Sequence, residues 1–229
     1  MPIEDDLVQR TLAELAAALE RLNGFDDAGA GDAGAGAAST SAAARALLDR
    51  AYRRHLGTAS EVVQRLPSDE LLAVISTTGR VDAERAFLTA ALLEVDAAVG
   101  EADLDPDRDA ALRLRALDLY AEAGLARVGV DDLGDRVRRL RADLSGHVLP
   151  EASYGRLLRW YLHEGRFAVA EDLLFEWLEE HGPSATLCAA GERLYDDLEG
   201  FTDERLEAGE LPRDEVLEGR TLFRRGCGA

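Results

Sequence analysis

The residue types that most often carry catalysis occur here without the spacing that catalysis or metal binding needs. None of the four histidines, His55, His147, His163 and His181, has a glutamate three positions earlier, so the Glu-x-x-His pair of carboxylate-metal bundles is missing. His163-Glu164 also lacks the second histidine of a zinc-protease helix. His55, His163 and His181 lie where we expect helices to end, and there an imidazole complements the helix dipole. We therefore predict no catalytic residue, no metal site and no cofactor.

Two cysteines and one glycine-rich motif are the remaining candidates for chemistry. Two cysteines are too few for a disulfide framework, and their spacing fits no zinc pattern. Cys188 lies in an apolar stretch, which predicts a buried thiol, whereas Cys227 follows two arginines in an exposed tail, where a redox role stays open. Residues 29–34 match G-x-G-x-x-G, but no apolar strand precedes them and Asp32 would repel a pyrophosphate, so we predict no nucleotide site.

The overall charge disfavours two further classes of partner. The 229 residues include 45 acidic and 26 basic side chains, a net charge of −19, and every basic residue is arginine. Polyphosphate repels a molecule of this charge, so we predict no binding to nucleic acid. The sequence contains neither an apolar run long enough to span a membrane nor a basic-then-apolar leader, which predicts no membrane partner and a cytoplasmic location.

The N-terminal part divides into two segments. Residues 1–23 predict an amphipathic helix whose apolar residues repeat by four, three and four, as in a coiled-coil seam. This seam consists of Val8, Leu12, Leu15 and Leu19. It could pack onto the rest of the protein, form a homodimer or bind a partner helix. Residues 24–44 are rich in glycine and alanine and predict a flexible linker, which leaves 45–229 as the main domain.

The main domain is predicted to be all-α. Apolar residues recur with helical spacing, Pro106 and Ser184 provide signals for helix starts, and no stretch alternates as a strand does. Short connections make successive helices antiparallel neighbours. The expected helices lie at about 41–56, 58–65, 68–77, 81–99, 106–124, 131–144, 151–164, 166–181, 184–199 and 212–224.

Residues 154–178 form the most informative stretch, because two amphipathic segments meet there at a glycine. The stretch resembles a tetratricopeptide unit, in which large residues on the first helix face a small residue on the second. The matching positions are Leu157, Tyr161, Gly165, Ala170, Leu174 and Pro183. The resemblance implies antiparallel helical hairpins stacked in a tetratricopeptide-like array, with residues 81–99 and 106–124 as a second, degenerate pair.

A second resemblance concerns the order of segments along the chain. An acidic-then-apolar first helix, a middle helical block and the segment with Gly165 and residues 170–176 are similar to a family of short bacterial all-helical proteins of unknown function. That resemblance implies no activity.

These patterns favour a non-enzymatic module for protein–protein interaction, with another protein or peptide as its partner. Aromatic and cationic residues of the clearest segment are the candidate groove residues, and these are Tyr154, Arg156, Arg159, Trp160 and His163. An alternative places Trp160 in the core and the arginines on an inert surface. Two further alternatives are a homodimeric structural or regulatory protein assembled through the N-terminal helix, and an enzyme whose site is not visible in the sequence.

The densest basic feature is an arginine cluster within residues 136–141. It consists of Arg136, Arg138, Arg139 and Arg141. We expect these side chains to pair with neighbouring acidic residues, although a site for an acidic partner segment or RNA stays open.

Overall fold

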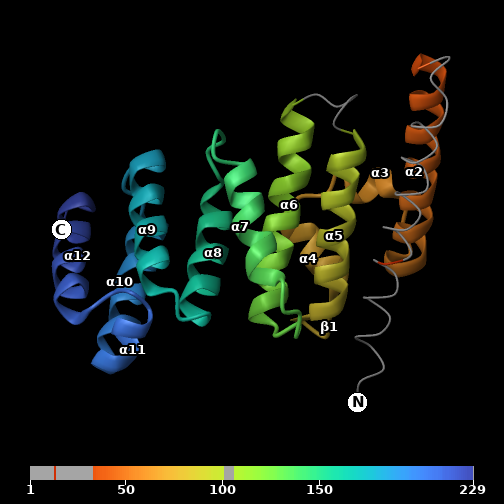
Figure 1. Ribbon diagram of the computed structural model, residues 1–229. Coiled ribbons are helices and arrows are strands. Elements are labelled where there is room, and N and C mark those ends of the chain that lie inside the picture. Colours follow the sequence, from red (N-terminus) through yellow and green to blue (C-terminus); the bar gives the residue numbers. More distant parts are fainter. Residues whose placement is uncertain (1–12, 14–32, 101–105, 229) are drawn as a thin grey trace. The chain divides into compact units, whose positions relative to one another are not determined.

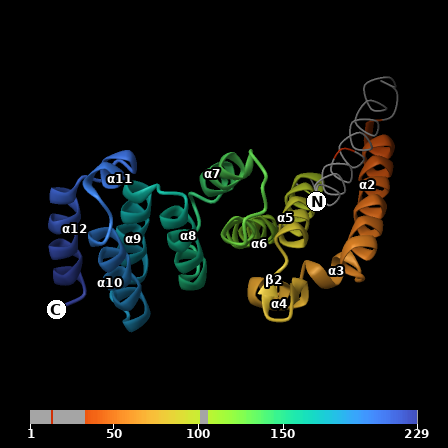
Figure 2. The ribbon, with the colours of Figure 1, turned by 90° about the horizontal axis from the view of Figure 1, so that it is seen from below.

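The computed structural model describes residues 13, 33–100 and 106–228, and these residues are almost entirely helical (Figures 1 and 2). The all-α prediction is therefore confirmed. The chain divides into two compact units, Met1–Gly146 and His147–Ala229. The boundary between the two units falls within residues 45–229.

The first unit contains six described helices and one short hairpin. They are α2 (Ala33–Leu56), α3 (Ser60–Val63), α4 (Ser68–Ile75), β1 (Ser76–Thr77), β2 (Arg80–Val81), α5 (Ala83–Gly100), α6 (Pro106–Leu125) and α7 (Leu133–Asp143). Helices α5 and α6 pack along each other, as their sequences predicted, while α2 covers α5 and α7 covers α6 (Figure 1). The Phe87 and Tyr120 rings, 5.2 Å apart, lie at the centre of this core.

The hairpin β1–β2 was not predicted. Thr78 and Gly79 connect its strands and both have positive φ angles, 53° and 79°, as in the tight turns that match strand twist. Each strand has two residues, too few for an alternating pattern to be recognised.

The second unit contains α8 (Glu151–His163), α9 (Phe167–His181), α10 (Ala185–Glu199), α11 (Asp203–Ala208) and α12 (Arg213–Gly226). Helices α8 and α9 form a hairpin that turns at Gly165, where φ is 72°, a conformation that glycine adopts without strain. Tyr154 of α8 stacks on Trp177 of α9 with ring centroids 5.7 Å apart. Helix α10 follows α9, and α12 packs on both α9 and α10 (Figure 2).

The predicted helices agree with the structure apart from two segments. Helix α2 begins at Ala33, so residues 33–44 of the predicted linker are helical, which fits the high helix propensity of their alanines. Helix α11 was missed because its single short stretch shows no periodicity. It begins at an N-cap, where the Thr202 side chain accepts a hydrogen bond from the Arg205 amide.

Candidate functional site

Helices α8 and α10 correspond to each other at four buried positions. Helix α8 begins at Glu151 and α10 begins at Ala185. The same spacing along the chain separates four buried residues of α8 from four buried residues of α10. The pairs are Ser153 with Leu187, Leu157 with Gly191, Trp160 with Leu194, and Tyr161 with Tyr195. Both helices therefore use the same positions to face the interior of the unit.

Helices α9 and α12 correspond in the same way, at the larger offset that separates Phe167 from Arg213. The buried pairs are Ala170 with Val216, Leu173 with Gly219, and Trp177 with Phe223. The larger offset reflects the segment between α10 and α12, which contains α11. This segment closes onto the first hairpin, because the Gly209 carbonyl accepts a hydrogen bond from the Ala168 amide at 3.1 Å.

The correspondence between α8 and α10 extends to their outer surfaces, and the two helices contact each other. One exposed arginine on each helix has a small residue four positions before it and a polar residue four positions after it. We call this surface the paired-arginine face. It comprises Ala152, Gly155, Arg159 and His163 on α8, and Thr186, Ala189, Arg193 and Asp197 on α10.

The two arginines of this face have equivalent local geometry. Arg159 Nε donates a hydrogen bond to the Gly155 carbonyl at 3.3 Å, and Arg193 Nε donates one to the Ala189 carbonyl at 3.0 Å. Glycine and alanine lack side-chain atoms beyond Cβ, so they leave the carbonyl four residues earlier within reach of the guanidinium. Both positions thus carry arginine, whose planar guanidinium group suits carboxylates as ligands.

The structure places the five predicted groove residues on two different sides of α8. Tyr154, Arg156 and Trp160 are buried, so the prediction that they line an open groove is wrong. The Tyr154 and Trp160 rings belong to the core, and the Tyr154 hydroxyl donates to Glu176 Oε1 at 2.9 Å. Arg159 and His163 are exposed, and their binding to a partner stays a prediction. The predicted seam of Val8, Leu12, Leu15 and Leu19 lies outside the described residues.

Three arginines of the cluster on α7 pair with acidic residues, as the sequence indicated. Arg136 and Arg139 both bind Glu94, at 3.3 and 2.5 Å, and Arg138 binds Asp135 at 2.8 Å. The Tyr120 hydroxyl also donates to Glu94, and burial, with the nearby Glu94 charge, raises the pKa of Tyr120. These three arginines therefore form ion pairs inside the first unit.

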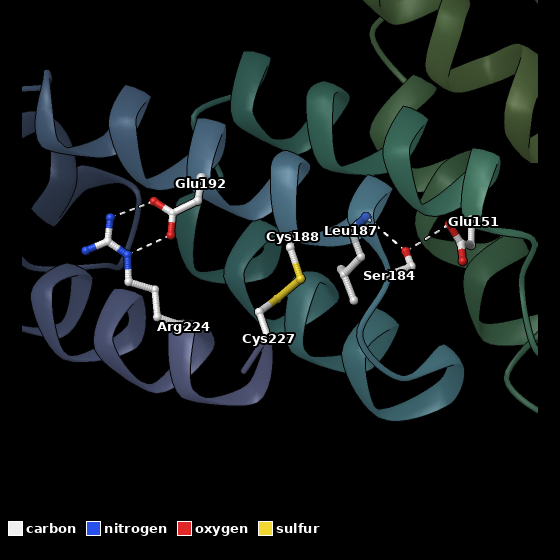
Figure 3. The surroundings of a disulfide bond; sticks show 7 residues. All are labelled: Glu151, Ser184, Leu187, Cys188, Glu192, Arg224 and Cys227. Atoms are coloured by element: carbon white, nitrogen blue, oxygen red, sulfur yellow. Dashed lines mark hydrogen bonds and ion pairs between the residues drawn. A yellow bond between two sulfur atoms is a disulfide. The ribbon is translucent and has the colours of Figure 1, made fainter. Parts of the chain in front are cut away.

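The two cysteines form a disulfide, which corrects the predictions of a buried thiol at Cys188 and an exposed thiol at Cys227. The bond joins the first turns of α10 to the end of α12, with the two Cα atoms 6.0 Å apart (Figure 3). Sequence spacing gave no sign of it, because the packing of α12 on α10 brings together residues 39 positions apart.

Glu192 binds Arg224 one turn away from the disulfide, and hydrogen bonds from Arg224 and Arg220 lower the pKa of Glu192 to about 2.

Clustered metal ligands are absent from the part of the chain that the structure describes. Within that part, no group of three or more histidine, cysteine or acidic side chains could hold a metal ion. No described helix is long and apolar enough to cross a membrane.

Comparison with known protein families gives a match over most of the chain. The model of a family of unknown function, DUF6483, matches residues 3–223. No curated protein and no solved structure matches the chain.

Proposed function

Because the chain belongs to DUF6483, a family of unknown function, we propose a function from the geometry of its second unit. The second unit is a tetratricopeptide-like module that binds an acidic segment of another protein on the paired-arginine face, and it catalyses no reaction. The observation that carries this proposal is the equivalence of Arg159 and Arg193, which hold the same position and the same backbone hydrogen bond on two neighbouring helices.

The spacing of the two hairpins supports the tetratricopeptide-like part of the proposal. The offset from Glu151, where α8 begins, to Ala185, where α10 begins, matches the repeat period of tetratricopeptide proteins. The second hairpin, α10 with α12, then differs from the first by an insertion that contains α11. Stacked hairpins of this kind present a continuous surface on their first helices, and extended peptides bind such surfaces.

The chemistry of the face favours carboxylates as ligands. Packed helices lie roughly 8–10 Å apart, so about that distance separates the axes of the two helices that carry the arginines. Alternate residues of an extended peptide project from one side and lie about 6.7 Å apart. Two glutamates separated by one residue therefore reach both arginines. Physiological salt screens the net charge of −19 beyond about 8 Å. Asp197 is the one acidic member of the face as defined above.

Fluorescence anisotropy with the full chain tests the proposal. The probe is a labelled heptapeptide that alternates serine and glutamate, and the control peptide carries glutamine in place of glutamate. An exposed ion pair contributes about 0.2–1 kcal/mol. We therefore expect Arg159→Gln and Arg193→Gln each to weaken binding up to about fivefold, and the double variant to lose most of it.

Arg225→Gln is the matched control, since Arg225 is exposed on α12, outside the face. This variant is expected to bind like the unmodified chain. The proposal is overturned if the chain does not bind the glutamate peptide, or if the double variant binds it unchanged. Equal binding of the glutamine peptide would also overturn it.

A further inference from the structure

A second candidate site lies in the first unit, independent of the paired-arginine face. A cleft of about 670 Å³ opens between α2, α3, α5 and the first turn of α6. This volume is typical of sites for small molecules. Asp96 of α5 lies in the cleft and is 6% exposed, and Gln64 and Arg108 line the cleft beside it.

A chain of hydrogen bonds fixes the charged groups in this cleft. Arg108 Nη2 donates to Gln64 Oε1 at 2.5 Å, and Gln64 Nε2 donates to Asp96 Oδ2 at 2.6 Å. Arginine has no acceptor atom, so the amide oxygen of Gln64 must face Arg108 and its nitrogen must face Asp96. The Tyr52 hydroxyl donates to the same Asp96 oxygen at 3.5 Å. The amide of Gln64 thus keeps a guanidinium and a carboxylate at a fixed separation.

The second oxygen of Asp96 remains available to a ligand. Oδ1 accepts no hydrogen bond from the described residues, although Asp96 is almost fully buried. A carboxylate in such a position is matched best by a cationic donor. Burial raises the pKa of Asp96, while its hydrogen bond from Gln64 and the charge of Arg108 act in the opposite direction.

The other charges of the cleft exclude ligands with a single sign of charge. Arg45, Arg53 and Arg108 oppose a purely cationic ligand. Asp49, Glu61 and Asp96 oppose an anion such as phosphate, and Asp49 is paired with Arg53 at 2.7 Å. A ligand that carries a positive and a negative charge close together can contact an acidic residue and an arginine of the cleft at the same time.

We propose that this cleft binds a free α-amino acid, with the ammonium group on Asp96 Oδ1 and the carboxylate on Arg108. Arg108 Nη2 and Asp96 Oδ2 are bridged by one carboxamide, whose nitrogen and oxygen are about 2.3 Å apart, so they lie within about 7.5 Å of each other. Asp96 Oδ1 lies about 2.2 Å from Oδ2. An α-amino acid separates its nitrogen from its carboxyl oxygens by about 2.7–3.6 Å. With a hydrogen bond of about 2.8 Å at each end, it spans about 8–9 Å. Ala46 and Ala59 provide small apolar surface for the side chain.

Isothermal titration calorimetry of the full chain tests this site with L-alanine, L-leucine, L-glutamine and L-glutamate as probes. For the amino acid that binds most tightly, the matching amine without the carboxyl group and the matching acid without the amino group are titrated next. We expect the acid without the amino group to bind at least tenfold more weakly, because it leaves the buried Asp96 unmatched. The amine without the carboxyl group is expected to bind up to about fivefold more weakly, because the contact that it loses is with exposed Arg108.

Two variants and one control locate the binding. Asp96→Asn keeps the shape of the side chain and removes its charge, so we expect at least tenfold weaker binding. Arg108→Gln changes an exposed side chain and is expected to weaken binding up to about fivefold without affecting the fold. Arg50→Gln is the matched control, because Arg50 is exposed on α2 and does not line the cleft.

The proposal is overturned if none of the four amino acids binds at millimolar concentration, or if one analogue binds as tightly as its parent amino acid. Unchanged binding by Arg108→Gln and a folded Asp96→Asn variant together would also overturn it. Circular dichroism establishes that the variants are folded. Neither result depends on the peptide binding proposed for the second unit.

Discussion

Reduction of the Cys188–Cys227 bond is expected to destabilise the second unit selectively. The bond closes a loop of 39 residues, and the chain-entropy relation for such a loop gives about 4 kcal/mol of stabilisation. Disulfides in proteins typically contribute about 2–4 kcal/mol. With a denaturant dependence of about 2 kcal/mol per molar in guanidinium chloride, reduction lowers the midpoint of unfolding by about 1–2 M.

The two tryptophans make this prediction measurable in the full chain. Trp160 and Trp177 are the only tryptophans, and both are buried in the second unit, so their fluorescence reports the unfolding of that unit. Unfolding by guanidinium chloride is followed with and without dithiothreitol. We expect the reductant to shift the tryptophan transition to lower denaturant concentration.

A double variant, Cys188→Ser with Cys227→Ser, separates the effect of the bond from other effects of the reductant. It is expected to unfold near the midpoint of the reduced chain and to be insensitive to dithiothreitol. The reasoning is refuted if the reductant leaves the tryptophan transition of the unmodified chain unchanged. It is refuted equally if the double variant shifts as much as the unmodified chain.

Three further predictions concern the second unit, and tryptophan fluorescence measures each of them. Gly191→Ala would place a Cβ atom in steric conflict with the Phe223 ring, so we expect the free energy of unfolding to fall by about 1–3 kcal/mol. The Cβ atom of Gly155→Ala would meet no atom within 4 Å, so we expect this variant to stabilise its helix. Equal effects of the two substitutions would contradict this prediction. Burial raises the pKa of Glu171, so the ionised form costs stability, and Glu171→Gln is expected to exceed the unmodified chain in stability at pH 7 but not below about pH 4.5. Hydrogen bonds to arginines lower the pKa of Glu192 to about 2, so Glu192→Gln is expected to be less stable at pH 7, with the difference disappearing as the pH falls from 4.5 through about 2. The two glutamate variants must therefore show opposite signs at pH 7.

Local signals made most of the helices predictable. Ser184 acts as the N-cap of α10 by accepting a hydrogen bond from the Leu187 amide, and Pro106 is the first residue of α6. The apolar residues of α7 recur with helical spacing, and Val137 and Leu140 are buried as expected. Caps and periodicity act within one or two turns, so the sequence alone displays them.

The candidate sites were harder to predict, because they depend on contacts between distant residues. The correspondence between α8 and α10 is hidden in the sequence, since Leu157 corresponds to Gly191 and an insertion separates α10 from α12. The exposure of Arg159 and the burial of Trp160, its neighbour, follow from which side of α8 meets α9. Gln64 bridges Asp96 and Arg108, which lie 32 and 44 residues away from it along the chain.

The close approach of Phe223 to Gly191 has a consequence for how far the helices of the two hairpins can be exchanged. The ring occupies space that a side chain on α10 would need, and α8 carries Leu157 at the corresponding position. A side chain at position 191 would therefore push the Phe223 ring away from α10. The two hairpins share a pattern of buried positions, but their helices pack at different depths, so we expect a chimera that exchanges α9 with α12 to be less stable than the unmodified chain.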